Sequence, residues 1–352
     1  MSKTKKIISV VGARPQFIKL APLYKEFLKH NEIEHLICHT GQHYNNEMSD
    51  VFFRDLGLPK SDFSLEIGSG NHGEQTGKML FKIEQVLLNE KPDMVIVFGD
   101  TNSTLAGSLV AAKLGINSIH IEAGLRSYNR KMPEEINRII SDHICNYLFA
   151  PTQTAVDNLL SEGLSDIVYL SGDIMADVLF ENLKRTENVI RKYIEDYYIL
   201  TLHRPYNVDD AEKLIKILKL VDLSGVKTIF PVHPRTKEVL SNTNFNFNNI
   251  ILTEPQGYLE FLTLQNHCKK IITDSGGIQK EAYLLKKPCI TLRGETEWVE
   301  TISTGWNLLI SKYDDMLPKQ INDFKPEGEH PDIFGKDVAK RMVDLAIRFM
   351  EL

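Results

Sequence analysis

The chain has 352 residues, of which 42% are hydrophobic and 25% charged, a composition typical of globular proteins that excludes disorder as the main state. Its formal net charge of −6 gives no general attraction for nucleic acid, so any phosphate binding must be local. No apolar stretch is long enough to span a membrane, and the first residues lack the apolar core of a signal peptide. We therefore expect a cytoplasmic protein that binds neither nucleic acid nor a membrane.

Short apolar runs alternate with helical patterns along the whole chain. The runs are continuously apolar, which is typical of parallel strands that are covered on both faces. Regular alternation of this kind predicts an α/β fold with doubly wound, Rossmann-like sheets. In chain order, we expect strands over Ile7–Val11, His35–Cys38, Met94–Phe98, Ser118–Ile121, Tyr147–Ala150, Val168–Leu170, Tyr198–Leu202, Thr228–Val232, Ile250–Leu252, Lys270–Thr273 and Cys289–Leu292.

The helical patterns divide the chain into two halves. Helices are expected over Thr101–Leu114 and Pro133–Asn146, and an amphipathic helix over Val338–Met350. A long polar helix over about 174–195 separates the first six strands from the last five, so we place the domain boundary at its start. The length of the chain suits two domains of about 150–200 residues. The stretch with the least structural signal is 312–335.

Charged residues follow several strands of the first half. Arg14 and Lys19 follow the first strand, and Pro15 suits the first turn of a helix whose N-terminus could bind an anion. Asp100 follows the strand that ends at Phe98, although an Asp there is often only a helix cap. Ligands of doubly wound folds bind beyond the carboxyl ends of the strands, so we expect these residues at one edge of the sheet.

Two further motifs supply carboxylates to the same edge. Glu122 follows the strand that ends at Ile121, and Glu134 with Arg138 stands on the helix expected over Pro133–Asn146. A spacing of four residues is also that of a solvated ion pair between Glu134 and Arg138. Carboxylates crowded near cations can have different pKa values, so that one accepts and another donates a proton. The pattern favours acid/base chemistry.

The second half carries its own polar motifs after strands. His203 follows one strand, and His233 with Arg235 follows the next. The residues 275–277 read SGG and open a helix, where a hydroxyl and bare backbone N–H groups can hold a diphosphate. Glu281, one turn into this helix, could reach ribose hydroxyls. A serine cap with a glycine turn is the plainer alternative, and neither a P-loop nor a GxGxxG motif is present, so ATP and NAD have no support.

The sequence predicts no metal and no cofactor. The histidines lack the spacing of a zinc site, and no GxSxG or Cys–His nucleophile pattern is visible. Each of the four cysteines stands in or beside an apolar run and none forms a CxxC pair, which is typical of buried, reduced thiols.

Eight motifs in the same order resemble the non-hydrolysing UDP-N-acetylglucosamine 2-epimerases. The resemblance covers about residues 7–310. Any one motif is weak, but the ordered set is specific. The motifs are GARPQFIK (12–19), TGQH (40–43), GDTNSTLAG (99–107), HIEAGLRS (120–127), MPEEINR (132–138), TLHR (201–204), HPR (233–235) and TDSGGIQKEA (273–282).

The resemblance implies a glycosyltransferase-B-like fold of two Rossmann-like domains with the active site between them, and a homodimer. The domains would be 1–173, with a last helix over 336–352 packing back on it, and 174–335. The implied reaction removes the C2 proton and expels UDP from C1 to give a 2-acetamidoglucal, and UDP then returns while C2 is protonated on the other face. No cofactor is implied, and the family's role in glycan precursor supply is an expectation.

The motifs also carry over individual residues. Asp100, Glu122 and Glu134 become acid/base candidates, and His203 a catalytic candidate near the departing diphosphate. The remaining carried-over residues contact the nucleotide, its phosphates or the sugar. They are Arg14 and Lys19 at the nucleotide or phosphates, His233 and Arg235 flanking the site, Ser275, Gly276 and Gly277 at the diphosphate, Glu281 at the ribose, Phe261 on the uracil, and Arg138.

Some segments depart from the common family pattern. The opening reads GARPQ where the family has GTRPE, and GETEWVE follows Arg293. These features look most like the branch that acts on UDP-2,3-diacetamido-2,3-dideoxyglucuronate, with UDP-N-acetylglucosamine itself as the alternative substrate. Tyr44, Asn45 and Lys78 stand where members activated by a second UDP-N-acetylglucosamine differ, so we expect that site to be altered or absent. A retaining UDP-sugar glycosyltransferase, a hydrolysing epimerase and a nucleotide-sugar sensor are the rival functions.

Overall fold

A computed structural model of the chain describes residues 4–42, 56–186, 195–232, 234–241 and 246–351. The chain forms two compact units, one of Met1–Val178 with Ile333–Leu352 and one of Leu179–Asp332. The expected ranges, 1–173 with 336–352 and 174–335, differ from these units by a few residues at each boundary.

Unit 1 is built on a seven-stranded parallel sheet in the order β3-β2-β1-β4-β5-β6-β7. Its strands are β1 (Lys5–Val11), β2 (Ile33–His39), β3 (Phe63–Ser64), β4 (Met94–Phe98), β5 (Asn117–Ile121), β6 (Tyr147–Ala150) and β7 (Val168–Leu170). Its helices are α1 (Arg14–Phe27), α3 (His72–Glu90), α4 (Asn102–Leu114), α5 (Pro133–Ile144), α6 (Gln153–Ser161), α7 (Ile174–Arg185), which continues into unit 2, α15 (Val338–Glu351) and the 3₁₀ turn η1 (Ser165–Ile167).

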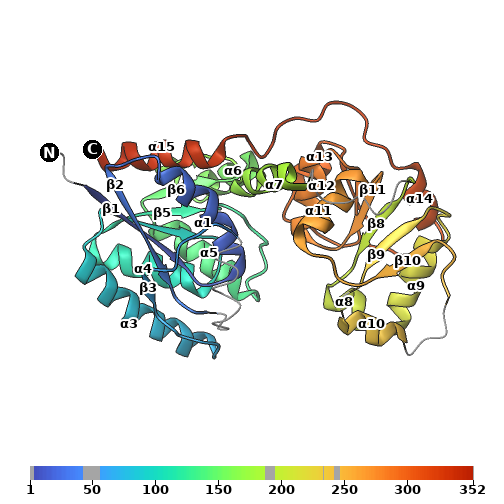
Figure 1. Cartoon of the computed structure of the whole chain (residues 1–352), viewed down its shortest axis with the longest axis horizontal. Coiled ribbons are helices and arrows are strands. Elements are labelled where there is room, and N and C mark those ends of the chain that lie inside the picture. Colours follow the sequence, from blue (N-terminus) through green and yellow to red (C-terminus); the bar gives the residue numbers. More distant parts are fainter. Residues whose placement is uncertain (1–3, 43–55, 187–194, 233, 242–245, 352) are drawn as a thin grey trace. The chain divides into compact units, whose positions relative to one another are not determined.

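Hydrophobic side chains cover both faces of this sheet, as the continuous apolar runs predict. Neighbouring residues of β1 belong to different buried clusters: Ile7 packs with α1 and α15, whereas Ile8 packs with α3 and α4. The last helix, α15, therefore belongs to the core of unit 1 and lies against α1 (Figure 1). Phe349 of α15 stacks on Tyr147, with ring centroids 3.8 Å apart and planes 5° from parallel.

Unit 2 repeats this architecture with a six-stranded parallel sheet in the order β10-β9-β8-β11-β12-β13. Figure 1 labels β8, β9, β10 and β11 of this sheet. Its strands are β8 (Tyr198–Thr201), β9 (Thr228–Pro231), β10 (Ile250–Thr253), β11 (Lys270–Thr273), β12 (Cys289–Thr291) and β13 (Asn307–Leu309). Its helices are α8 (Pro205–Val208), α9 (Ala211–Asp222), α10 (Pro234–Ser241), α11 (Tyr258–His267), α12 (Gly276–Leu284), α13 (Val299–Ser303) and α14 (Leu317–Asp323).

The sequence-based expectations differ from the structure at two strands and two helices. Strands β3 and β13 are not among the expected strands, and helix α14 lies within 312–335, where little structure was expected. The polar helix expected over about 174–195 is α7, which ends at Arg185, and much of the remaining range lies outside the described residues. No helix among the described residues is long and apolar enough to cross a membrane.

The strand order of each sheet fixes where a ligand can bind. In unit 1 the chain reverses its direction of travel across the sheet between β1 and β4, and in unit 2 between β8 and β11. Such a switch point leaves a crevice beyond the carboxyl ends of the two strands, where ligands of doubly wound folds bind. Arg14 and Asp100 follow β1 and β4, and His203 and Ser275 follow β8 and β11, so the predicted residues stand at both switch points.

Candidate functional site

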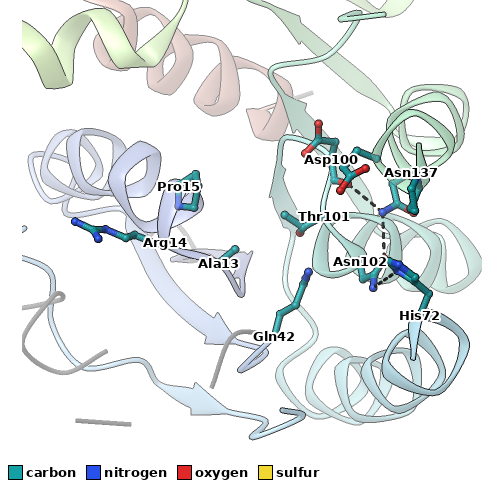
Figure 2. A pocket seen from close by; sticks show the side chains of 11 residues that line it. Ala13, Arg14, Pro15, Gln42, His72, Asp100, Thr101, Asn102 and Asn137 are labelled. Atoms are coloured by element: carbon teal, nitrogen blue, oxygen red, sulfur yellow. Dashed lines mark hydrogen bonds between the residues drawn. The ribbon is translucent and has the colours of Figure 1, made fainter. Parts of the chain in front are cut away.

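A pocket of about 330 Å³ lies at the switch point of unit 1. The predicted residues Arg14, Asp100 and Glu134 are among those that line it. Figure 2 shows Asp100 at one end of the pocket, while the Arg14 side chain extends away from it. The other lining residues are Ala13, Pro15, Gln42, His72, Thr101, Asn102, Pro133 and Asn137.

Arg138 connects Asp100 to the helix that carries Glu134. Its guanidinium pairs with the Asp100 carboxylate and with Glu135 Oε2 at 2.7 Å. The plainer alternative for this helix, an ion pair between Glu134 and Arg138, is not what the structure shows, because Arg138 pairs with Glu135, three residues away. Glu135 is fully buried and accepts hydrogen bonds from the Ser127 backbone N–H and hydroxyl, both at 2.9 Å. Burial alone would raise the pKa of Glu135, but these bonds and Arg138 hold it below its usual value.

Hydrogen bonds also fix the backbone that carries Asp100. The carbonyl of Asp100 accepts a bond of 3.0 Å from the Asn137 amide, and Asn137 also donates to Asn102 at 3.1 Å (Figure 2). Gln16 joins this segment to the loop after β1: its oxygen accepts from the Gly12 N–H at 2.7 Å, and its amide donates to the Phe98 carbonyl at 2.8 Å. The Gln16 side chain therefore connects the loops after β1 and β4 by hydrogen bonds.

Lys19 and Glu122 form an ion pair in which both side chains are nearly buried. Glu122 stands directly after β5 with a φ of +71°, a left-handed conformation that non-glycine residues rarely adopt. The pair lies against Gly99, because a Cβ there would be 3.3 Å from Glu122 Oε2 and 3.5 Å from Lys19 Nζ. Since Gly99 directly precedes Asp100, unit 1 brings all three predicted carboxylates to one edge of its sheet.

A buried ionic network lies behind these residues. His120 Nδ1 is 2.7 Å from Asp142 Oδ1, and His120 Nε2 is 2.7 Å from the Gly99 carbonyl oxygen. Arg126 donates to Asp142 at 2.7 Å and makes a two-bond pair with Glu162. His120 and Asp142 are fully buried. Burial alone would raise the pKa of Asp142, but His120 and Arg126 hold it below its usual value.

In unit 2, Asp274 organises the residues around His203. Its carboxylate lies 3.0 Å from His203 Nδ1 and accepts from the backbone N–H groups of His203 and Arg204 at 3.1 Å. Asn207 donates to the same carboxylate, also at 3.1 Å. Asp274 is buried while the His203 side chain is 53% exposed. Asp274 therefore orients an imidazole whose Nε2 can face a ligand.

The start of α12 has the form expected of an anion site. Ser275 is the N-cap, and its hydroxyl accepts from the Ile278 N–H at 3.4 Å. A Cβ on Gly276 would clash with Glu297 Oε1, so a carboxylate stands beside this N-terminus, where the helix dipole favours negative charge. Gly277 is exposed. Arg293 lies 3.1 Å from Glu297.

Glu281 faces the helix that carries Phe261. Gln265 of α11 donates to Glu281 at 2.7 Å, and the Tyr258 hydroxyl is 3.5 Å away. Phe261 stands three residues after Tyr258 and four before Gln265, which places it on the same face of α11. Burial raises the pKa of Glu281.

Several expectations lie outside what the structure describes. His233, Tyr44 and Asn45 lie outside the described residues, as does the side chain of Arg235, whose backbone belongs to α10. Lys78 is described, and it pairs with Glu74 at 2.6 Å on the surface of α3.

Among the described residues, no group of three or more His, Cys, Asp or Glu side chains could hold a metal ion. The four cysteines, Cys38, Cys145, Cys268 and Cys289, are buried and unpaired, and burial raises the pKa of each thiol to about 12.

The sequence-based reasoning missed residues that hold the predicted ones. Gln16, Glu135 and Asp274 stand inside the motifs and could have been selected from them, because each is a polar residue within two positions of a predicted one. Asp142 has no such signal, since it lies beyond the motif that ends at Arg138.

Known proteins resemble this chain along almost its whole length. The profile of the UDP-N-acetylglucosamine 2-epimerase family matches residues 25–344. A UDP-N-acetylglucosamine 2-epimerase homolog of Methanococcus maripaludis is 50% identical over 336 residues, which cover 92% of this chain and 94% of the relative. The UDP-2,3-diacetamido-2,3-dideoxy-D-glucuronate 2-epimerase of Pseudomonas aeruginosa is 44% identical over 320 residues, which cover 89% of this chain and 90% of that one.

A solved structure resembles this chain in both sequence and fold. The crystal structure of Methanocaldococcus jannaschii UDP-GlcNAc 2-epimerase in complex with UDP-GlcNAc and UDP has a TM-score of 0.81 and 44% sequence identity. The match covers 97% of this chain and 99% of that one. The predicted resemblance and the predicted glycosyltransferase-B-like fold class are thereby confirmed. This chain belongs to the UDP-N-acetylglucosamine 2-epimerase family and is an enzyme of that type.

Proposed function

We propose that the enzyme inverts C2 of a UDP-activated N-acetylhexosamine by eliminating and re-adding UDP, with Asp100, Glu122 and Glu134 as its acid/base groups. The observation that carries the proposal is that Asp100 and Glu134 line one pocket, while Glu122 lies beside Gly99, the residue before Asp100. Lys19 pairs with Glu122, and Arg138 pairs with Asp100. Proton transfer at a carbon needs a positioned base on one face and a positioned acid on the other.

The bond changes balance without a redox partner. A carboxylate takes the C2 proton, the C1–O bond to UDP breaks, and the electron pair of the C–H bond forms the C1=C2 bond of a 2-acetamidoglucal. UDP leaves as an anion and returns to C1 while C2 receives a proton on the opposite face. Lys19 and Arg138 balance the charge of the carboxylates, and the pocket residues orient the sugar.

Unit 2 supplies groups suited to the nucleotide. The N-terminus of α12 at Ser275, Gly276 and Gly277 would bind the diphosphate, whose charge increases as it leaves. His203, oriented by Asp274 at 3.0 Å, would donate a hydrogen bond to the same group. We assign Glu281 to the ribose and Phe261 to the uracil, because both belong to one α11–α12 surface.

We propose UDP-N-acetylglucosamine as the substrate. Two relatives support this substrate. The Methanococcus epimerase homolog is more identical to this chain than the Pseudomonas enzyme is, and the Methanocaldococcus enzyme was crystallised in complex with UDP-GlcNAc. UDP-2,3-diacetamido-2,3-dideoxyglucuronate is the second candidate, because the Pseudomonas enzyme is 44% identical and because this chain shares the GARPQF and TEWVE segments of that branch.

A direct comparison of the two sugars tests the substrate. Each UDP-sugar is incubated alone with the enzyme, and the products are separated and identified by NMR. We expect a C2 epimer that still carries UDP from UDP-N-acetylglucosamine and slower conversion of the diacetamido acid. Faster conversion of the diacetamido acid would reverse the assignment, and stoichiometric free UDP without an epimer would contradict the non-hydrolysing reaction.

We further propose that the enzyme is a cytoplasmic homodimer. Because Tyr44, Asn45 and Lys78 depart from the family pattern, we expect that the activating site for a second UDP-N-acetylglucosamine is altered or absent. Sedimentation equilibrium tests the dimer. The rate on a fixed concentration of the diacetamido acid, with and without UDP-N-acetylglucosamine, tests activation: a rate that depends strictly on the added sugar contradicts our expectation.

A further inference from the structure

We infer that His120 and Asp142 are positioning residues that jointly fix the backbone at Asp100 and at Glu122. The inference rests on the proposed acid/base roles of those two carboxylates. Neither His120 nor Asp142 lines the pocket, and both are fully buried, so their effect on the reaction must pass through the residues they hold.

Each oxygen of the Asp142 carboxylate connects to one of two loops, the loop after β4 and the loop after β5. Oδ1 contacts His120 Nδ1 at 2.7 Å, and His120 Nε2 contacts the Gly99 carbonyl at 2.7 Å, one residue before Asp100. Oδ2 accepts from the Gly124 N–H at 3.2 Å, two residues after Glu122. One side chain of α5 therefore sets the backbone at Gly99 and at Gly124 relative to each other.

The hydrogen-bond chemistry of His120 makes this connection rigid. A carbonyl oxygen can only accept, so Nε2 must carry a proton to bond to Gly99. Nδ1 faces the Asp142 carboxylate, so the ring is held from both sides. A hydrogen bond to a carboxylate in a buried site is short and strong, and Arg126 balances the second carboxylate, Glu162, at 2.7 Å.

Little room exists for this backbone to shift. Gly99 has a φ of +64°, and a Cβ placed there would be 3.3 Å from Glu122 Oε2, which is closer than an ordinary van der Waals contact. Loss of the bond to its carbonyl would let the Gly99–Asp100 peptide rotate and move the Asp100 carboxylate relative to Glu122. A misplacement of about 1 Å can lower a rate about a hundredfold. Substrate binding, which depends mainly on the UDP, should change little.

Two substitutions at His120 separate positioning from folding. In His120→Gln the amide nitrogen reaches the place of Nε2 and can still donate to Gly99. In His120→Asn it reaches the place of Nδ1 and can donate only to Asp142. We expect the kcat of His120→Asn to fall about a hundredfold and that of His120→Gln to fall by less than about tenfold, with KM within about twofold of the wild type in both.

His35 provides the matched control. It is a partly buried histidine of β2 whose Nε2 bonds to Ser9 Oγ at 2.8 Å, away from the loops after β4 and β5. Both His35→Asn and His35→Gln should lower the melting temperature and leave kcat unchanged, which measures the effect of side-chain size alone. Asp142→Asn adds a second approach should His120→Asn fail to fold, and we expect it to lower kcat with KM unchanged.

The double variant completes the test. If His120 and Asp142 act through one network, His120→Asn combined with Asp142→Asn should lose about as much as the worse single variant, because energies of coupled residues do not add. Equal kcat for the two His120 variants and the wild type would overturn the inference while the wild type still epimerises. The inference would also be overturned if the His35 variants lost as much kcat as His120→Asn. A wild type that epimerises neither sugar would overturn the proposed function as well.

Discussion

Lys19 and Glu122, which lie 103 positions apart in the chain, form a nearly buried ion pair beside Gly99. The sequence predicts that Lys19 contacts the nucleotide or its phosphates, and that stays a prediction. In this structure Lys19 balances the charge of a proposed acid/base group. A cation so placed can stabilise the carboxylate between proton transfers.

This pair gives the first prediction. Glu122→Gln should lower kcat by more than about a hundredfold, the usual scale for an acid/base group, and Asp100→Asn and Glu134→Gln should do the same. Lys19→Met should also lower kcat, because it leaves a carboxylate without its cation. Steady-state kinetics with UDP-N-acetylglucosamine measures the effect, and full activity in all three carboxylate variants would contradict the assignment.

Asp274 gives a prediction on stability and pH. Burial alone would raise its pKa, but bonds from His203, Asn207 and Arg204 hold it below the ordinary 3.8. A lowered native pKa contributes stability that is present above the unfolded value and is lost as pH falls through the native one. Asp274→Asn should therefore be less stable at pH 7 and lose less on acidification. Urea unfolding from pH 7 to pH 3 measures this, with exposed Asp315→Asn as the control.

The Asp274 variant should also affect the reaction. Without the carboxylate, the His203 ring loses the partner 3.0 Å from Nδ1, so its Nε2 is no longer held toward the ligand. We expect a lower kcat and weaker UDP binding by calorimetry. An unchanged kcat in the folded variant would remove His203 from the proposed mechanism.

His35 gives a second prediction on pH. It is a base rather than an acid, but its lowered pKa also makes the protein less stable as the pH falls. Burial lowers its pKa from 6.5 to about 3, and it packs between Tyr24 and Phe27. Below the unfolded pKa only the unfolded state binds the proton, so stability falls as pH drops below 6.5. The slope from this group is at most about 1.4 kcal/mol per pH unit. His35→Gln should remove that part of the slope between pH 6.5 and pH 4.5, and an identical slope in the variant would contradict the assignment.

Gly12 and Gly77 give a matched pair of alanine substitutions. A Cβ on Gly12 would clash with Thr40 Oγ1 and Ser103 Oγ, whereas nothing lies within 4 Å of a Cβ on Gly77 in α3. Gly12→Ala should cost about 1–3 kcal/mol by overpacking and should lower kcat by displacing the loop of Arg14. Gly77→Ala should add about 0.5–1 kcal/mol through helix propensity. Denaturant melts compare the two.

Most of the fold could be predicted because parallel strands carry a strong local signal. The runs at β4 and β6 are continuously apolar and, apart from the partly buried Tyr147, buried, and their bounds agree with the expected ones. Strand β13 was missed because it has three residues, of which only Asn307 is buried. Helix α14 was missed because Pro318 reads as a helix breaker, although proline is tolerated in the first turn.

The members of the site could be selected from sequence, but most of their partners could not. Motifs after strands indicate which residues reach a sheet edge, because topology alone fixes that position. The pairs Lys19–Glu122 and Arg138–Asp100 depend on side-chain reach across loops. The choice of Glu135 over Glu134 as the partner of Arg138 follows from Ser127 and its neighbour, which hold Glu135 in the buried position.

The central claim is that the enzyme breaks and remakes the C2–H bond without hydrolysing the nucleotide sugar. NMR of UDP-N-acetylglucosamine incubated with the enzyme in D₂O measures it most directly. The account predicts deuterium at C2 in the epimerised product, with UDP still attached at C1. An epimer that keeps its original C2 hydrogen, or no exchange at all in folded enzyme with either UDP-sugar, would contradict it.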